Sequence, residues 1–516
     1  MSFPWLTTLA LLPIIGALVT FSLHGRTAKQ VGLAFAGVTA VLGVVVFFLA
    51  GGANNLSEQV SWIRPIGAWY ALNVDGMGKT LVLLTVLLVP IVLAYEWNLD
   101  ARAAAADTEA DPAVAHPQAR WDAALFVPLV LLLEGLTLYV FMAADVLLFY
   151  IFFEATLVPM YFLIAGWGGP NRSRAAMKFL LFSLAGGLIL LFAVIGVYAV
   201  SARSGPGTFL LADLLKIQFG GAMGRWLFIG FFIAFAIKAP MVPVHTWLPD
   251  TAAQATPGTS TLLVSTLDKI GTFGMIRFCL GLFPEASKWA TPVVLGLAVL
   301  SVLYGALMAI GSANLLRLVA FTSISHFGFM VLGIFSMTTQ ALSGTIFYML
   351  AHGLSAAALF LVVGMMMDRR GSADVYAYGG AEKVAPVLAG VFLTAGLATL
   401  GLPGLANFVG EFLIMAGSWQ RNLVYVAIAL VGTVLAALYV LLAYQRTMTG
   451  PVTPQTREHI TTDLGAREKA VIAPLLVLLL LFGFWPKPML DVVGSTAKDT
   501  MAQVAMTDPA PQVGVK

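Results

Sequence analysis

Long apolar segments recur along the whole chain and are separated by short polar turns. Each of about fourteen segments approaches the roughly 20 residues that a helix needs to cross a bilayer. The alternating segments of about ten residues that are typical of outer-membrane barrels are absent from the sequence. The pattern therefore predicts an all-α polytopic membrane protein with spans near residues 3–22, 31–50, 79–95, 122–142, 145–167, 175–200, 226–247, 257–283, 290–310, 314–336, 340–367, 386–418, 424–445 and 470–486.

The composition agrees with a membrane location. Hydrophobic residues make up 59% of the 516 positions and charged residues only 10%, whereas a soluble domain carries about 25% charged residues. The first apolar segment has no basic residue before it, so we interpret it as a span and not as a signal peptide. The single cysteine, Cys279, excludes an internal disulfide and a cysteine-ligated cluster. No basic patch with interleaved aromatic residues indicates nucleic-acid binding.

Basic residues orient the predicted spans, because cytoplasmic loops carry an excess of Lys and Arg. The turns "MAAD" and "SMTTQ", after the fourth and tenth spans, have neither residue. We therefore expect both termini on the outer side of a bacterial plasma membrane. The segment 95–122 is expected to be a solvated insert and "DPAPQVGVK" a disordered tail. The basic residues expected in the cytoplasm are Arg26, Lys29, Arg172, Arg174, Lys178, Arg317, Arg369, Arg370, Lys383, Arg446, Arg457, Arg467 and Lys469.

Several ionisable residues fall inside the predicted spans. An acid or a lysine at the centre of a spanning helix disfavours insertion by about 2.5–3.5 kcal/mol, so such residues mark functional sites by default. We expect them to form a polar track inside the bundle, where protonation is their useful property. The candidates are Glu134, Glu154, Lys238, Asp268, Lys269, His326, His352 and Glu411, with His245 nearer a helix end.

Each candidate also has a purely structural interpretation. Glu134 would serve as one half of an interior pair. Asp268 would be the counter-charge of its neighbour Lys269 or would face another helix, because adjacent residues point about 100° apart. A lone buried histidine is often a hydrogen-bonded core residue, but His326 and His352 fall at similar depths in neighbouring spans. The sequence has no His-x-x-x-His or Cys-x-x-Cys spacing, so no metal site is expected.

Two predicted spans are interrupted. In "AFAIKAPMVPVHTWLPD", Pro240 and Pro243 cannot donate backbone hydrogen bonds, so the seventh span should open beside Lys238 and expose carbonyl groups to water. The twelfth span contains "LATLGLPGLANF" and should break near Gly401–Gly404, close to Glu411. Breaks about five spans apart fit two inverted repeats. The predicted divisions are residues 1–121 (first three spans and insert), 122–284 and 285–446 (five-span repeats), and 447–516 (last span and tail).

A buried lysine holds its proton more firmly when a carboxylate is close. If Glu154 approaches Lys238, the ammonium form is favoured, and if Glu154 moves away, the proton is released more easily. A movement of this one pair is therefore expected to drive a proton step.

These segments resemble the antiporter-like subunits of respiratory complex I and of Mrp-type sodium/proton antiporters, over nearly the whole chain. "FFEATLVPMYFLI", "AFAIKAPMVPVHTWLPD", "DKIGTFGMIRF", "SISHFGFM" and "AHGLSAAALFL" are similar to the fifth, seventh, eighth, tenth and eleventh helices of that family. The resemblance implies a switch pair (Glu154 and Lys238), a central axis (Lys269, His326 and His352), a terminal exchange residue toward the outer side (Glu411) and a second acid in the fourth helix (Glu134).

The resemblance also implies a role in redox-driven proton translocation. Flavin, iron–sulfur clusters and quinone would belong to partner subunits, and this chain would hold no cofactor. Its partners would be other membrane subunits, including two further antiporter-like chains, with lipids, protons and water. In this family one of the three antiporter-like chains has a glutamate at the position of Glu411, and the others typically have a lysine. Two positions depart from the family pattern: Ala252 stands where a histidine is common, and Asp268 where an apolar residue is usual.

Four alternatives remain open from the sequence. The chain would otherwise be an Mrp-type sodium/proton antiporter subunit, an antiporter-like subunit of a membrane hydrogenase, a solute transporter that uses the same broken helices, or a structural membrane anchor.

Overall fold

The computed structural model describes residues 3–50, 56–99, 121–203 and 205–510. Most of the predicted insert and the end of the predicted tail lie outside these residues. The N-terminal part holds α1 (Trp5–Phe21), α2 (Gly25–Leu49), β1 (Ser57–Ile63), η1 (Arg64–Ile66), β2 (Ala68–Asn73), α3 (Gly76–Tyr95) and η2 (Glu96–Asn98).

The next part of the chain contains the first predicted repeat. Its elements are η3 (Ala123–Leu125), α5 (Phe126–Met142), α6 (Val146–Ala155), α7 (Leu157–Trp167), α8 (Arg172–Ser201), α9 (Leu211–Leu214), α10 (Gly221–Lys238), α11 (Trp247–Ala252), α12 (Pro257–Leu262), η4 (Leu263–Leu267), α13 (Lys269–Gly274) and η5 (Met275–Leu280).

The second predicted repeat and the C-terminal helices follow. These elements are α14 (Pro284–Ile310), α15 (Leu315–Phe335), α16 (Thr339–Arg370), η6 (Val375–Ala377), η7 (Ala381–Lys383), α17 (Pro386–Thr399), α18 (Ala406–Met448), α19 (Pro454–His459), α20 (Ala466–Phe484) and α21 (Lys487–Val504).

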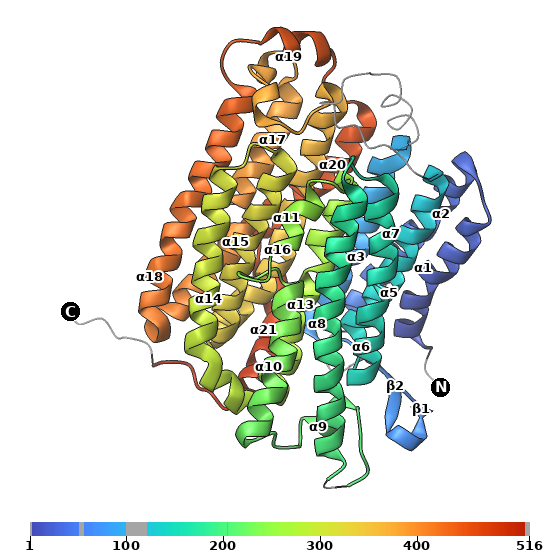
Figure 1. Ribbon diagram of the computed structural model, residues 1–516, viewed down its shortest axis with the longest axis vertical. Coiled ribbons are helices and arrows are strands. Elements are labelled where there is room, and N and C mark those ends of the chain that lie inside the picture. Colours follow the sequence, from blue (N-terminus) through green and yellow to red (C-terminus); the bar gives the residue numbers. More distant parts are fainter. Residues whose placement is uncertain (1–2, 51–55, 100–120, 204, 511–516) are drawn as a thin grey trace.

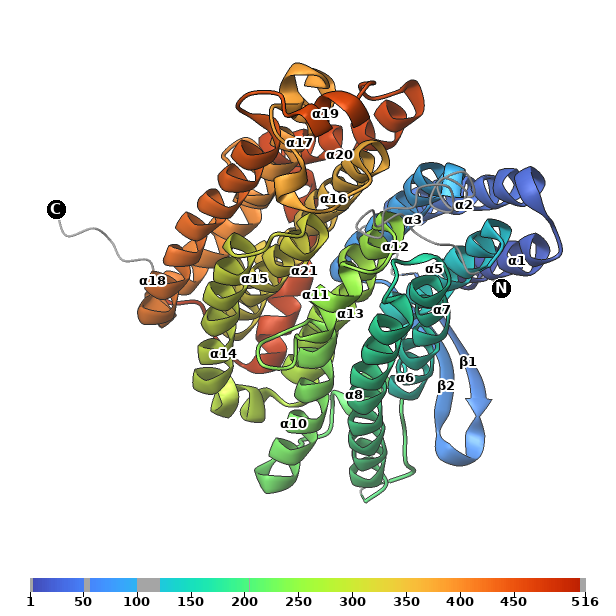
Figure 2. The same cartoon turned by 45° about the horizontal axis from the view of Figure 1, so that its top comes forward.

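The helices form one bundle, with the β1–β2 hairpin and α9 at one end and α19 at the other (Figure 1). We call these the hairpin end and the α19 end. Figure 2 shows α5–α8 on one side, α14–α18 on the other, and α10–α13 between them. The predicted all-α membrane fold is confirmed, apart from the two-stranded hairpin, whose antiparallel strands were not predicted.

Among the described residues, ten helices are long and apolar enough to cross a membrane, and α20 with the bent α21 would make an eleventh. The remaining predicted spans are formed by a short helix or by helices in pieces. They correspond to α1, to the series α12–η5, to α17 with the first half of α18, and to α20.

The first interruption follows α10, which ends at Lys238. The freed carbonyl of Ile237 accepts a hydrogen bond from the indole Nε1 of Trp247 at 3.0 Å. Ser301 on α14 accepts from the amide of Val242 at 3.0 Å. The predicted break is therefore confirmed, but side chains from α11 and α14 bind backbone groups at the break, where the sequence suggested only water.

The second interruption lies between α17 and α18, as predicted. Gly401 and Gly404 have φ values of +76° and +94°, a backbone conformation that side chains with a Cβ rarely adopt. A Cβ on Gly401 would also lie 2.8 Å from Oε2 of Glu411. The glycine therefore provides both the turn and the space for the acid.

The helix α18 reverses direction within its length, because Asn422 has non-helical backbone angles (φ −134°, ψ 42°). A straight helix would separate Glu411 from Tyr439 by about 42 Å at 1.5 Å per residue. Both nevertheless reach the ring of His326, Glu411 at 3.3 Å from Nδ1 and Tyr439 at 3.4 Å from Nε2. The two halves of α18 thus correspond to the predicted twelfth and thirteenth spans.

Matching features at opposite ends of the bundle fit the predicted inverted repeats. Asp145 accepts hydrogen bonds from the first amides of α6 and forms an isolated β-bridge with Leu210. Asn314 caps α15 in the same way and forms a bridge with Asp374. Each cap opens the second helix of a repeat, and each bridge precedes the broken helix by a similar distance.

A helix that the sequence did not predict follows the last span. The chain bends by 73° between α20 and α21. One face of α21, with Met489, Val493 and Ala497, is buried, and Thr496 accepts a hydrogen bond from the first amide of α3 at 2.9 Å. Asp508 then accepts from the amide of Thr339 at the start of α16 at 2.7 Å. The C-terminal segment therefore packs against the bundle as far as Asp508, the first residue of the predicted tail.

Replacing Trp247 by Phe should destabilise the protein, because the buried carbonyl of Ile237 loses its donor. An unsatisfied buried group costs about 1–3 kcal/mol. Trp167→Phe is the matched control, since Trp167 is equally buried and its indole nitrogen has no hydrogen-bond partner among the described residues. The thermal midpoint of the detergent-purified protein should fall more for Trp247→Phe. Equal midpoints would contradict this role of the indole.

Candidate functional site

Lys238 lies at the first interruption and is buried, with 1% of its surface exposed. Among the described residues its ammonium nitrogen has no hydrogen-bond partner. The nitrogen lies 5.4 Å from the ring centre of Phe153 and 5.7 Å from that of Phe179. Aromatic faces attract a cation only weakly compared with a carboxylate, so the ammonium group depends on nearby acids.

Glu154 on α6 is one such acid. Its carboxylate packs against Gly187 of α8, where a Cβ would lie 1.8 Å from Oε1. Glu154 and Lys238 interact electrostatically, but among the described residues the ammonium nitrogen of Lys238 has no hydrogen-bond partner. The two residues of the predicted switch pair are thus close enough to interact electrostatically but are not in direct contact.

Lys269 begins α13 and lies in the centre of the bundle. Its ammonium nitrogen is 2.7 Å from Nδ1 of His352 on α16 and donates to the carbonyl of Val264 at 3.1 Å. The same nitrogen is 4.5 Å from the ring centre of Phe327. Lys269 and His352, two members of the predicted central axis, are therefore in direct contact.

The contacts continue from His352 to the second interruption. The rings of His352 and His326 have centres 5.1 Å apart. Nδ1 of His326 is hydrogen-bonded to the hydroxyl of Tyr348, which donates to Oε1 of Glu411. The same Nδ1 lies 3.3 Å from that carboxylate oxygen. All four side chains are buried, so a polar path leads from the centre of the bundle to Glu411.

Two members of this path were not among the sequence candidates. Tyr348 joins His326 to Glu411, and the hydroxyl of Tyr439 is 3.4 Å from Nε2 of His326. A tyrosine in an apolar span is not singled out as a functional residue, because it carries no charge at neutral pH. The spacing does contain a signal, since Tyr348 lies four residues before His352 and so shares its helix face.

Glu134 on α5 is buried but stands apart. Neither of its carboxylate oxygens has a hydrogen-bond partner among the described residues, and no described ion pair or hydrogen bond joins it to Glu154 or Lys238. The structure therefore does not connect this candidate to the path.

His245 lies in the segment between α10 and α11. It is buried, with its ring against Tyr304 at a centre distance of 4.8 Å. It interacts electrostatically with Lys178, a residue of a surface pocket. His245 therefore stands between that pocket and Lys238 along the chain.

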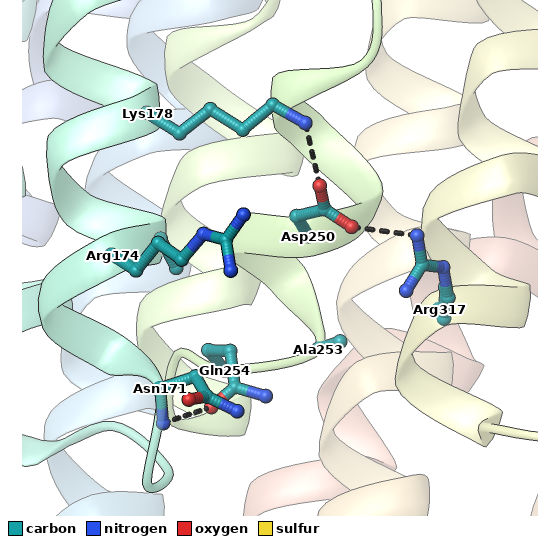
Figure 3. A pocket seen from close by; sticks show the side chains of 8 residues that line it. Asn171, Arg174, Lys178, Asp250, Ala253, Gln254 and Arg317 are labelled. Atoms are coloured by element: carbon teal, nitrogen blue, oxygen red, sulfur yellow. Dashed lines mark hydrogen bonds and ion pairs between the residues drawn. The ribbon is translucent and has the colours of Figure 1, made fainter.

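The pocket has a volume of about 350 Å³ and polar walls. Asp250 is its centre: the carboxylate contacts Lys178 at 2.5 Å and Arg317 at 2.6 Å, and Arg174 points toward it (Figure 3). These residues come from α11, α8 and α15. The pocket lies on the side of the molecule where α8 and α15 begin.

The described residues contain no group of three or more His, Cys, Asp or Glu side chains that would hold a metal ion. The arrangement is suited to accepting and donating protons, because its members are bases and acids in contact with one another.

Comparisons with known proteins find relatives over nearly the whole chain. A family model described as "NADH:quinone oxidoreductase/Mrp antiporter, TM" matches residues 143–436. NADH-quinone oxidoreductase subunit M of Mycobacterium tuberculosis is 46% identical, covering 99% of this chain and 96% of that protein. The corresponding protein of Pseudomonas aeruginosa is 37% identical over 95% of this chain and 96% of its own length.

Solved structures also match. A chain of respiratory complex I from Thermus thermophilus with bound NADH has a TM-score of 0.85 and 32% identity, covering 97% of this chain and 99% of that one. A chain of the Mrp complex from Dietzia sp. has a TM-score of 0.81 at 22% identity, covering 98% of this chain and 100% of that one, and shows the fold alone. By the family model and these full-length relatives, the chain belongs to the NADH:quinone oxidoreductase/Mrp antiporter family of multi-pass membrane proteins.

Proposed function

We propose that this chain is an antiporter-like membrane subunit of a proton-translocating NADH-quinone oxidoreductase and that it conducts protons through its buried acids and bases. The observation that carries the proposal is the buried sequence of contacts from Lys269 through His352, His326 and Tyr348 to Glu411. The name and full-length similarity of the subunit M relatives support the assignment to this enzyme.

Protons enter at the pocket around Asp250 and reach Lys238 by way of His245. The pocket is lined by several of the basic residues that we expect on the cytoplasmic side. If the pocket faces the cytoplasm, both termini lie on the outer side of the membrane, and we propose this orientation. His245 is suited to the step because a histidine ring accepts a proton on one nitrogen and donates from the other.

The switch pair, Glu154 and Lys238, couples proton entry at this pocket to the redox reaction of the enzyme. Two unit charges 4 Å apart attract by about 4 kcal/mol at an effective dielectric constant of about 20. Moving one charge across 100 mV requires about 2.3 kcal/mol. The change in electrostatic energy when this pair closes or opens is therefore large enough to decide whether Lys238 keeps its proton against the membrane potential.

The exit follows the central axis. Lys269 passes a proton to His352 at 2.7 Å, and water or a ring rotation covers the gap to His326. Tyr348 then joins His326 to Glu411, whose carboxylate receives the proton beside the second interruption. Glu411 releases it toward the outer side.

The partners follow from the same proposal. NADH oxidation, with flavin and iron–sulfur clusters, and quinone reduction take place in other subunits, and two further antiporter-like chains share the membrane arm. Within this chain, residues 122–284 and 285–446 act as the two halves of the conducting unit, located in the bacterial plasma membrane.

Lys238→Met should abolish most proton translocation by the assembled enzyme. Methionine fills a similar volume but carries no proton, and loss of a proton-transferring group typically costs about 10²–10⁴-fold in rate. NADH-driven acidification of proteoliposomes measures the effect, and NADH oxidation with an artificial acceptor verifies assembly. Translocation at the wild-type rate would contradict the proposal. Purification without flavin and iron–sulfur subunits would favour an Mrp-type antiporter instead.

Tyr348→Phe should slow translocation by about tenfold, because it removes the hydroxyl that joins His326 to Glu411. Tyr425→Phe is the matched control, since its hydroxyl donates to the carbonyl of Pro292 at the protein surface. The same vesicle assay should show wild-type rates for the control. If both variants pump equally well, Tyr348 is not part of the route.

A further inference from the structure

Asp268 is a buried acid for which the route above has no role. Its exposed fraction is 0%. Neither carboxylate oxygen has a hydrogen-bond partner among the described residues. Burying a carboxylate without a partner is strongly unfavourable, unless the group takes up a proton or interacts with a neighbouring cation. Asp268 therefore needs a compensating partner, either a proton or a nearby cation.

The helix packing shows which way Asp268 faces. Gly271, three residues later, lies against the end of α10, where a Cβ would be 2.5 Å from the amide nitrogen of Ala239 and 2.6 Å from the carbonyl oxygen of Phe235. Residues three apart share a helix face. Asp268 thus points toward the end of α10, where Lys238 is located.

Lys269 points in a different direction, because the next residue of a helix is rotated by about 100°. It contacts His352 on α16. Asp268 interacts electrostatically with Lys238 and with Lys269, and Lys238 interacts with both Asp268 and Glu154. One carboxylate therefore stands between the lysine of the switch and the lysine of the central axis.

The local backbone supports this placement. The helix widens at η4, and the amide of Asp268 donates to the carbonyl of Leu263, five residues earlier, at 3.0 Å. Such wide turns add a residue to the helix and frequently occur at functional sites. Here the wide turn ends where Asp268 and Lys269 must face two different helices.

We propose that Asp268 carries the proton between Lys238 and Lys269. The proposal rests on the proposed function of the chain. In the first step the Lys238 ammonium gives a proton to the Asp268 carboxylate, leaving a neutral amine and a neutral acid. In the second step the acid gives that proton to a neutral Lys269, which restores the carboxylate and forms the second ammonium. The transfer requires bridging water, because no described hydrogen bond joins these groups.

The test compares three variants in the complete enzyme reconstituted in vesicles. Asp268→Asn keeps the shape of the side chain but cannot carry the proton, so the rate of NADH-driven acidification should fall by about tenfold or more. Asp268→Glu keeps a carboxyl group and should retain at least half of the wild-type rate. Glu285→Gln, at an exposed acid paired with Lys288, is the control and should pump normally.

The outcomes separate this inference from the proposed function. Wild-type pumping by Asp268→Asn, with pumping lost in Lys238→Met, overturns the role of Asp268 and leaves the function standing. Wild-type pumping in both variants overturns the function itself. Equal loss in the Asn and Glu variants, at normal NADH oxidation with an artificial acceptor, also overturns the inference, because it assigns Asp268 a packing role.

Discussion

A charge buried in a membrane protein must be compensated by another charge, a hydrogen bond or water, and the arrangement of this bundle follows from that requirement. Lys269 meets it with His352 and a backbone carbonyl, and Glu411 with Tyr348 and His326. Lys238 lacks a direct partner among the described residues. Lys238 shares this property with Glu134 and Asp268, and its place at the interruption of α10 makes its charge sensitive to a change of partner.

The helix interruptions place these groups. Proline after Lys238 ends α10 inside the bundle and sends the chain toward the pocket at Asp250, while glycines between α17 and α18 make room for Glu411. Regular helices would expose neither the ends nor the small gaps that these side chains occupy. Two tightly packed glycines also place polar groups. Gly271 brings the helix of Asp268 close to the end of α10, and Gly187 leaves room for the carboxylate of Glu154 against α8.

Much of this was predictable, for physical reasons. Apolar length alone indicates a spanning helix, and a lysine before two prolines indicates a break with a buried charge, so Lys238, Lys269, His326, His352 and Glu411 could be named from the sequence. Tyr348 could not be singled out, because its hydroxyl is neutral and only its partners reveal its role. The turn at Asn422 falls between the predicted twelfth and thirteenth spans, whereas the helix α21 was missed, since it is too polar to resemble a span. For Glu134 the sequence predicts correctly that an acid is buried, but it cannot show which side chains surround that acid.

The account depends on hydration between groups that do not touch. The most direct test is an electron cryo-microscopy map of the assembled enzyme in a lipid membrane, at a resolution that shows ordered water. We expect waters that bridge Lys238, Asp268 and Lys269 and that continue beside the histidines to Glu411. A dry gap filled by apolar side chains between Lys238 and Lys269 would contradict it.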